Sequence, residues 1–101
     1  MSVGELDPVI HAPARLRVVA TLATLGPGDE MTFPRLQKLL DMTGGNLSTH
    51  LRKLEDAEYV AVTKTHEGRK PVTYLALTPA GRRAFEIYTE TLRQIVRGAT
   101  P

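Results

Sequence analysis

The chain has 101 residues, of which 42% are hydrophobic and 24% are charged, and none is cysteine. This length suits a single domain spanning residues 1–101, and the lack of cysteine excludes disulfides and thiolate metal sites. The longest uncharged apolar run, residues 18–25, is too short to cross a bilayer, and the first residues lack the pattern of a secretory signal. We therefore expect a cytoplasmic protein with no membrane segment.

The formal net charge of +2 is distributed unevenly along the chain. Residues 1–30 have two basic and four acidic side chains, a net of −2, whereas residues 31–83 have nine basic and five acidic ones, a net of +4. Such a local excess is a weak indication of an anionic partner, because most charge on a small domain is simply solvated surface.

Proline and glycine mark the limits of a first helix. Asp7-Pro8 predicts an N-cap followed by proline in the first turn, and Ala12-Pro13 predicts a second start one turn later. The helix should continue to about Leu25, because proline and two glycines at 26–28 cannot extend it.

A helix-turn-helix is predicted over about residues 32–57. Thr32 can cap a helix that ends near Met42, and the next apolar stripe begins only three residues later, after Thr43-Gly44-Gly45. Two amphipathic helices joined by so short a glycine-containing turn cannot lie fully antiparallel, and the helix-turn-helix is the known solution. The leucines of the two stripes are Leu36, Leu39, Leu40, Leu47, Leu51 and Leu54.

The pattern then changes to alternating β-branched and aromatic residues. Two strands are predicted at 59–65 and 71–77, and the tip between them at 67–70 contains Gly68, which can adopt a positive φ. This wing, about 59–77, precedes Thr78-Pro79, which begins a long helix over about 79–97. The predicted fold is mainly α with a small β-hairpin: a winged helix-turn-helix plus a long C-terminal dimerisation helix.

Four stretches, residues 13–19, 45–55, 59–60 and 77–82, resemble the small MarR/ArsR-like winged helix-turn-helix transcriptional regulators. The resemblance implies a dimeric protein that binds double-stranded DNA, with the third helix in the major groove and the wing along the phosphate backbone. ArsR-type metal sensors use cysteine ligands that are missing here, so neither a metal nor a cofactor is expected. Larger MarR-type proteins have further dimerisation helices, for which this chain has no length. The resemblance does not indicate whether a small-molecule effector exists.

The residues alone also indicate DNA binding. The exposed face of the third helix carries side chains that pair with base edges, and glycines at its start let the helix N-terminus approach a phosphate. Basic side chains on the wing, and one in the second helix, are candidates for phosphate contacts. The alternative interpretations are helix capping, which we expect for Thr43, and a solvated turn. The predicted DNA-binding residues are Arg35, Thr43, Gly44, Gly45, Asn46, Ser48, Thr49, Arg52, Lys53, Lys64, Arg69 and Lys70.

Two other functional classes are less consistent with the sequence. An enzyme is not expected, because His11, His50 and His66 have no partners at metal-ligand spacing and no phosphate loop or nucleophile elbow is present. His50, between two leucines, is predicted to be a half-buried packing residue. A winged helix that binds protein within a larger nucleic-acid assembly is the stronger alternative, but the polar exposed face of the third helix favours DNA.

Apolar faces predict a homodimer. The final helix has a long apolar stripe and the first helix is apolar on nearly all sides, which together exceed what one small domain can bury. The alternative is that the stripe folds back on its own domain. The predicted interface residues are Val18, Leu22, Phe85, Tyr88, Leu92, Ile95 and Val96.

Overall fold

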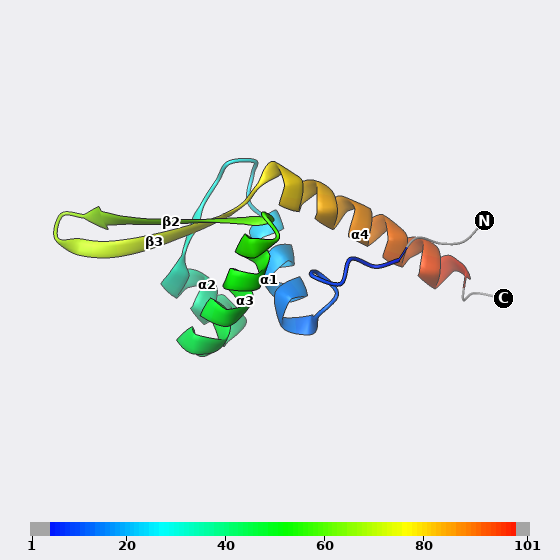
Figure 1. The fold of residues 1–101 in the computed structure, drawn as a ribbon, viewed down its shortest axis with the longest axis horizontal. Coiled ribbons are helices and arrows are strands. Elements are labelled where there is room, and N and C mark those ends of the chain that lie inside the picture. The colour runs from blue at the N-terminus through cyan, green and yellow to red at the C-terminus, as the bar shows by residue number, and fades with distance from the viewer. Residues whose placement is uncertain (1–4, 99–101) are drawn as a thin grey trace.

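The computed structural model describes residues 5–98 and confirms the winged helix-turn-helix with a C-terminal helix (Figure 1). The hairpin and the last helix extend from opposite sides of a small helical body, which gives extents of 59 × 25 × 21 Å. Within the described residues, every helix is too short or too polar to cross a lipid bilayer. The elements in chain order are α1 (Pro13–Ala23), β1 (Met31–Thr32), α2 (Phe33–Leu40), α3 (Gly44–Asp56), β2 (Val60–Glu67), β3 (Lys70–Leu77) and α4 (Pro79–Gly98).

Helix α1 begins at the second of its two predicted starts. Asp7 instead closes a short turn, in which its Oδ1 accepts a hydrogen bond of 2.8 Å from the backbone N–H of Val9. Pro13 supplies the first turn of α1, where its missing N–H costs nothing. The prediction of a helix starting at Asp7-Pro8 is therefore wrong.

Within the described part of the chain, the sheet has three antiparallel strands in the order β1-β3-β2, of which the sequence predicted two. Strands β2 and β3 pair from Val60↔Leu77 to Glu67↔Lys70, so the turn contains only Gly68 and Arg69. Gly68 has φ 64°, as its predicted place in the tip required. Strand β1 adds two residues at the other edge of β3.

The core corrects part of the predicted dimer interface. Helix α1 lies in the centre of the body, where Val18 and Leu22 have no exposed surface and pack in the same cluster as Leu36, Leu54 and other apolar residues of its neighbours. Side chains already covered by their own chain have no surface left for a second copy. Including Val18 and Leu22 in a dimer interface was therefore wrong.

Helix α4 is packed along one face as far as Thr91 and is exposed from Leu92 onward. Tyr88 is buried, with its hydroxyl 2.9 Å from Nδ1 of His11, and half-buried Phe85 packs against the core. Tyr88 is thus also excluded as an interface residue. Leu92 and Ile95, one and two turns later, are 38% and 39% exposed, so the stripe folds back on its own domain only in part.

Candidate nucleic-acid interface

The turn between α2 and α3 sets the direction of α3. Asp41 ends α2 in the left-handed conformation at φ 52° and ψ 49°, and the chain changes direction over residues 41–43 before α3 begins. Thr43 then caps α3, as predicted, because its Oγ1 accepts a 3.1 Å hydrogen bond from the backbone N–H of Asn46. Gly45 is exposed in the first turn, and a Cβ placed on it would meet no atom within 4 Å. The N-terminus of α3 is therefore open to a close approach by a ligand.

The predicted side chains of α3 are all exposed, but they lie on two flanks of the helix. Ser48 and Arg52 face the wing, whereas Lys53 lies on the opposite flank near residues 8–9. Between them, Thr49 donates a 3.0 Å hydrogen bond from its hydroxyl to the carbonyl of Gly45. This bond occupies the hydroxyl proton of Thr49, so an acceptor oxygen and a methyl group remain available for a base.

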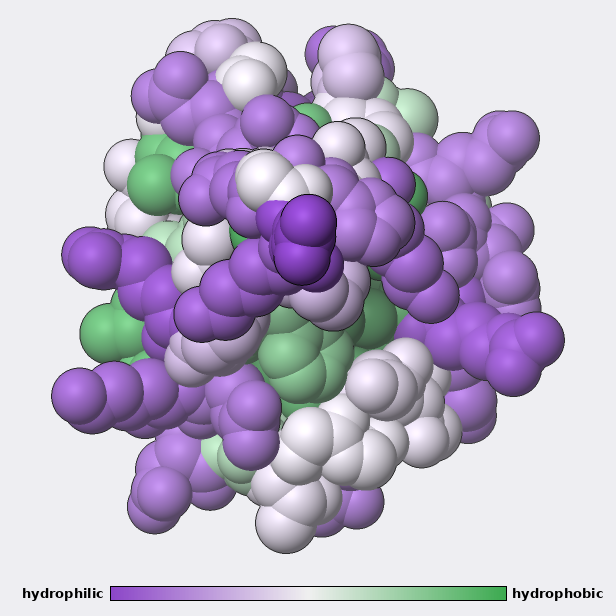
Figure 2. Space-filling model, turned by 90° about the vertical axis from the view of Figure 1, so that its left-hand side faces the viewer, coloured by the Kyte–Doolittle hydropathy of each residue, from purple (hydrophilic) through white to green (hydrophobic). Residues whose placement is uncertain are grey.

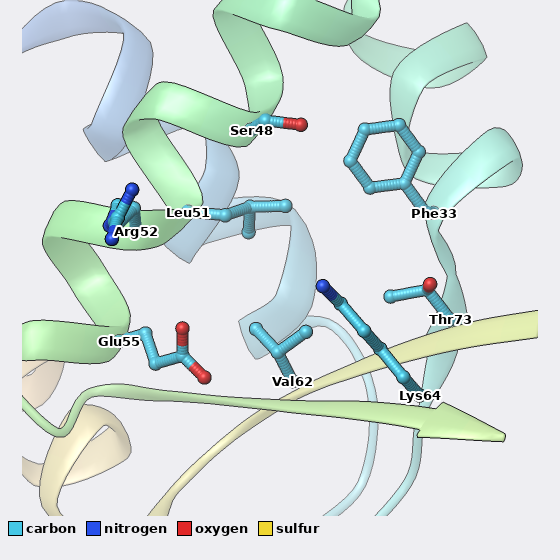
Figure 3. A pocket seen from close by; sticks show the side chains of 8 residues that line it. All are labelled: Phe33, Ser48, Leu51, Arg52, Glu55, Val62, Lys64 and Thr73. Atoms are coloured by element: carbon cyan, nitrogen blue, oxygen red, sulfur yellow. The ribbon is translucent and has the colours of Figure 1, made fainter.

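A groove of about 810 Å³ separates α3 from the wing (Figure 3). Leu51 and Val62 give it apolar lining, and Lys64 extends into it from β2. The groove thus brings together three predicted site residues, Ser48, Arg52 and Lys64, from two elements. The complete lining is Phe33, Ser48, Leu51, Arg52, Glu55, Val62, Lys64 and Thr73.

Viewed toward the wing tip, the molecule shows hydrophilic side chains around a hollow with apolar surface (Figure 2). Arg69 and Lys70 lie at the tip itself, outside the groove, and Arg35 lies in the first turn of α2. All three are exposed. The acid of the tip, Glu67, accepts a hydrogen bond from the hydroxyl of Tyr74, and this bond raises the pKa of that tyrosine.

Other arginines have structural roles. Arg17 donates a 2.8 Å hydrogen bond to the carbonyl of Leu40 at the end of α2, and Arg82 donates one of 3.0 Å to the carbonyl of Leu25 just after α1. Both guanidinium groups lie near a helix C-terminus, where a positive charge is favourable. Within residues 5–98, by contrast, the side chains of the predicted cations of the interface have no hydrogen bond or ion pair. These are Arg35, Arg52, Lys53, Lys64, Arg69 and Lys70.

Sequence reasoning missed the acidic side chain of the groove. Glu55 lines the groove together with Arg52, three residues earlier, and Ser48, seven residues earlier. Residues at this spacing share one flank of a helix, and this was the signal that could have identified Glu55. His50 is half-buried, as predicted, and its Nδ1 has no hydrogen-bond partner. Within residues 5–98, no group of three or more potential ligands could hold a metal ion.

Comparisons with known proteins agree with this architecture. The family model described as "Winged helix DNA-binding domain" matches residues 14–96. The chain is 30% identical over 87 residues to the uncharacterized protein MJ0432 of Methanocaldococcus jannaschii, covering 86% of this chain and 91% of that protein.

Solved structures give the same result. A transcriptional regulator homologue from Pyrococcus horikoshii OT3 is 28% identical with a TM-score of 0.82, over 92% of this chain and 89% of that one. MepR of S. aureus, solved in complex with DNA, shares the fold at 20% identity and a TM-score of 0.72, over 89% of this chain and 71% of that one. The chain therefore belongs to the winged helix DNA-binding domain family, which confirms the resemblance to winged-helix regulators found in its sequence.

Proposed function

We propose that this protein is a sequence-specific transcriptional regulator that binds double-stranded DNA as a homodimer, with α3 in the major groove and the wing on the phosphate backbone. The observation that carries the proposal is the groove between α3 and the wing. It joins side chains of types that can pair with bases to a cation that can pair with phosphate, and these side chains are exposed and without protein partners. MepR, of the same fold, was solved with DNA, and we extend that partner to this chain.

Helix α3 supplies the contacts to bases. Asn46 can form two hydrogen bonds with adenine, and Arg52 can form two with guanine O6 and N7. Thr49 offers its methyl group to thymine, since its hydroxyl proton is held by Gly45. The open N-terminus of α3 is suited to a phosphate, because its free N–H groups and helix dipole favour an anion.

The wing and the start of α2 supply contacts that position the domain. Arg69 and Lys70 at the tip, Lys64 in the groove and Arg35 on α2 are cations without protein partners, so each can pair with a phosphate at no cost in broken ion pairs. Such contacts add affinity for any duplex and carry no sequence information directly.

The exposed end of α4 supports the dimer. Leu92 and Ile95 continue the buried face of Tyr88 beyond the body of the domain, and Val96 beside them is 60% exposed. An apolar strip of this kind is suited to pack against its own copy about a two-fold axis. Two copies of α3 then lie about one DNA turn apart, ~34 Å, and the operator is an imperfect palindrome.

Fluorescence anisotropy with a selected duplex and a random duplex tests the division of roles. Asn46→Ala and Arg52→Ala should cost about 1–3 kcal/mol mainly on the selected duplex. The double variant Arg69→Ala/Lys70→Ala should weaken both duplexes by the same factor. Arg93→Ala, which removes a cation paired with Glu90 on α4, is the matched control and should change neither. Equal losses on both duplexes for the α3 variants would contradict base reading by α3.

A further inference from the structure

Glu55 is a carboxylate on a surface that otherwise suits a polyanion. It lies on α3 one turn after Arg52, is exposed, and lines the same groove as Ser48 and Lys64. Figure 3 shows its carboxylate directed from α3 toward the wing. Within residues 5–98 its carboxylate has no hydrogen bond or ion pair that would neutralise it. Contacts within the protein therefore do not explain the presence of this acid in the groove.

The chemistry of DNA limits what Glu55 can face. An ionised carboxylate only accepts hydrogen bonds, and a phosphate oxygen also only accepts them, so the two repel each other. In the major groove the base edges offer donors only at the amino groups, N4 of cytosine and N6 of adenine. Of these, cytosine presents its donor without an adjacent acceptor on the same base, which suits a carboxylate better than adenine does.

We infer that Glu55 is a specificity residue that accepts a hydrogen bond from the amino group of cytosine at one position of the preferred site. The inference rests on the proposed function, because it requires α3 to lie in the major groove. Three residues of helix rise by about 4.5 Å, close to the ~3.4 Å between base pairs, so Arg52 and Glu55 can contact neighbouring pairs. Arg52 then selects guanine and Glu55 selects cytosine.

Asp56 provides a matched control. It is the next residue of α3, is also exposed and acidic, and lies on the opposite flank beside Lys53 and residues 8–9. Changing either acid to alanine removes one negative charge from the same helix turn. Both variants should therefore tighten binding to random duplex by a similar factor, and only Glu55→Ala should alter the base preference.

The experiment selects bound duplexes from a random library and then measures anisotropy on single-base variants of the preferred site. For Glu55→Ala we expect the preference for cytosine at one position to fall about tenfold, while the preferences at other positions stay unchanged. A tenfold loss is at the lower end of the discrimination that one base contact provides. Glu55→Gln should shift that position toward adenine, because an amide can pair with N6 and N7 together. Asp56→Ala should leave the whole profile unchanged.

Two different results would contradict the role of Glu55 and the proposed function, respectively. An unchanged base profile for Glu55→Ala, with the same gain on every duplex as Asp56→Ala, would overturn the role of Glu55 and leave the proposed function intact. Failure of the unsubstituted protein to bind any duplex would overturn the proposed function itself.

Discussion

The backbone of Gly81 lies directly against the backbone of Tyr59, so that a Cβ on Gly81 would stand 2.1 Å from the carbonyl oxygen of Tyr59. The same carbonyl accepts a 3.0 Å hydrogen bond from the N–H of Thr78, where the wing ends and α4 begins. Thr78 in turn caps α4 by accepting a 2.9 Å hydrogen bond from the N–H of Gly81. These contacts fix the direction of α4 relative to the base of the wing.

Gly81→Ala should therefore destabilise the fold. The obstructing atoms belong to backbone and cannot move aside, so we expect a loss of at least about 1–3 kcal/mol in the free energy of unfolding. Gly45→Ala is the control, because the same change in open space within a helix should stabilise by about 0.5–1 kcal/mol. Urea unfolding of both variants measures the difference, and equal effects would contradict the close approach at Gly81.

Glu58 occupies a position that usually belongs to glycine. After α3 the N–H of Tyr59 bonds to the carbonyl of Leu54 and the N–H of Glu58 to that of Glu55, the Schellman pattern, and Glu58 has φ 64°. Glu58→Gly should raise the free energy of unfolding by about 1 kcal/mol, since glycine adopts this conformation without strain. Glu58→Val, which is β-branched, should lower it. A loss of stability for the glycine variant in urea unfolding would exclude strain at this residue.

Alkaline pH should release the chain segment before α1. The hydroxyl of Tyr59 donates a 2.5 Å hydrogen bond to Oδ2 of Asp7, and this bond, with burial and the charge of Asp7 adding to it, raises the pKa of Tyr59. A raised pKa means that the stabilisation is complete below the ordinary tyrosine pKa of about 10 and is lost as pH rises through the folded value.

This loss of stabilisation at alkaline pH can be measured from melting temperatures. The unsubstituted protein and Tyr59→Phe are compared at pH 7 and at pH 11. The difference between the two proteins should shrink at the higher pH. Tyr74→Phe in the same background controls for the second tyrosine of raised pKa, whose partner is Glu67. A difference that is independent of pH would show that the hydroxyl of Tyr59 contributes no such stabilisation.

Leu92→Asp should convert the proposed dimer to a monomer, because it places a charge in the centre of the exposed apolar strip of α4. Ile87→Asp is the matched control: Ile87 is 54% exposed but lies five residues earlier, about 140° around the helix. Light scattering at micromolar concentration should give a dimer mass for the unsubstituted protein and Ile87→Asp. A monomer mass for the unsubstituted protein would refute the dimer.

The helices and the hairpin were predictable because each has its own periodicity or turn residues, such as Thr43-Gly44-Gly45 before α3. Strand β1 was not predictable, because a strand of two residues is too short to show an alternating pattern. Its pairing with β3 is set by tertiary structure. The assignment of Val18 and Leu22 to an interface failed for a related reason. A helix that is apolar on most sides is buried either by a partner or by its own domain, and only the packing of α1 distinguishes the two.

The candidate site was predictable as a set of residue types but not as an arrangement. The sequence placed Arg52 and Lys53 on one exposed face, whereas the wing divides that face into two flanks and leaves only Arg52 in the groove. Likewise, nothing local to Arg82 distinguishes it from a DNA-binding arginine. Its partner is the carbonyl of Leu25, 57 residues away.

The salt dependence of binding to a random duplex tests the central claim most directly. Contacts from Lys and Arg to phosphate release condensed counterions, so affinity should be measurable at ~50 mM salt and should fall steeply by ~200 mM. In the variant Arg69→Ala/Lys70→Ala, the slope of log affinity against log salt should be shallower by about two per protomer. A folded dimer that binds no duplex at ~50 mM salt would contradict DNA binding and favour a protein partner for the same surface.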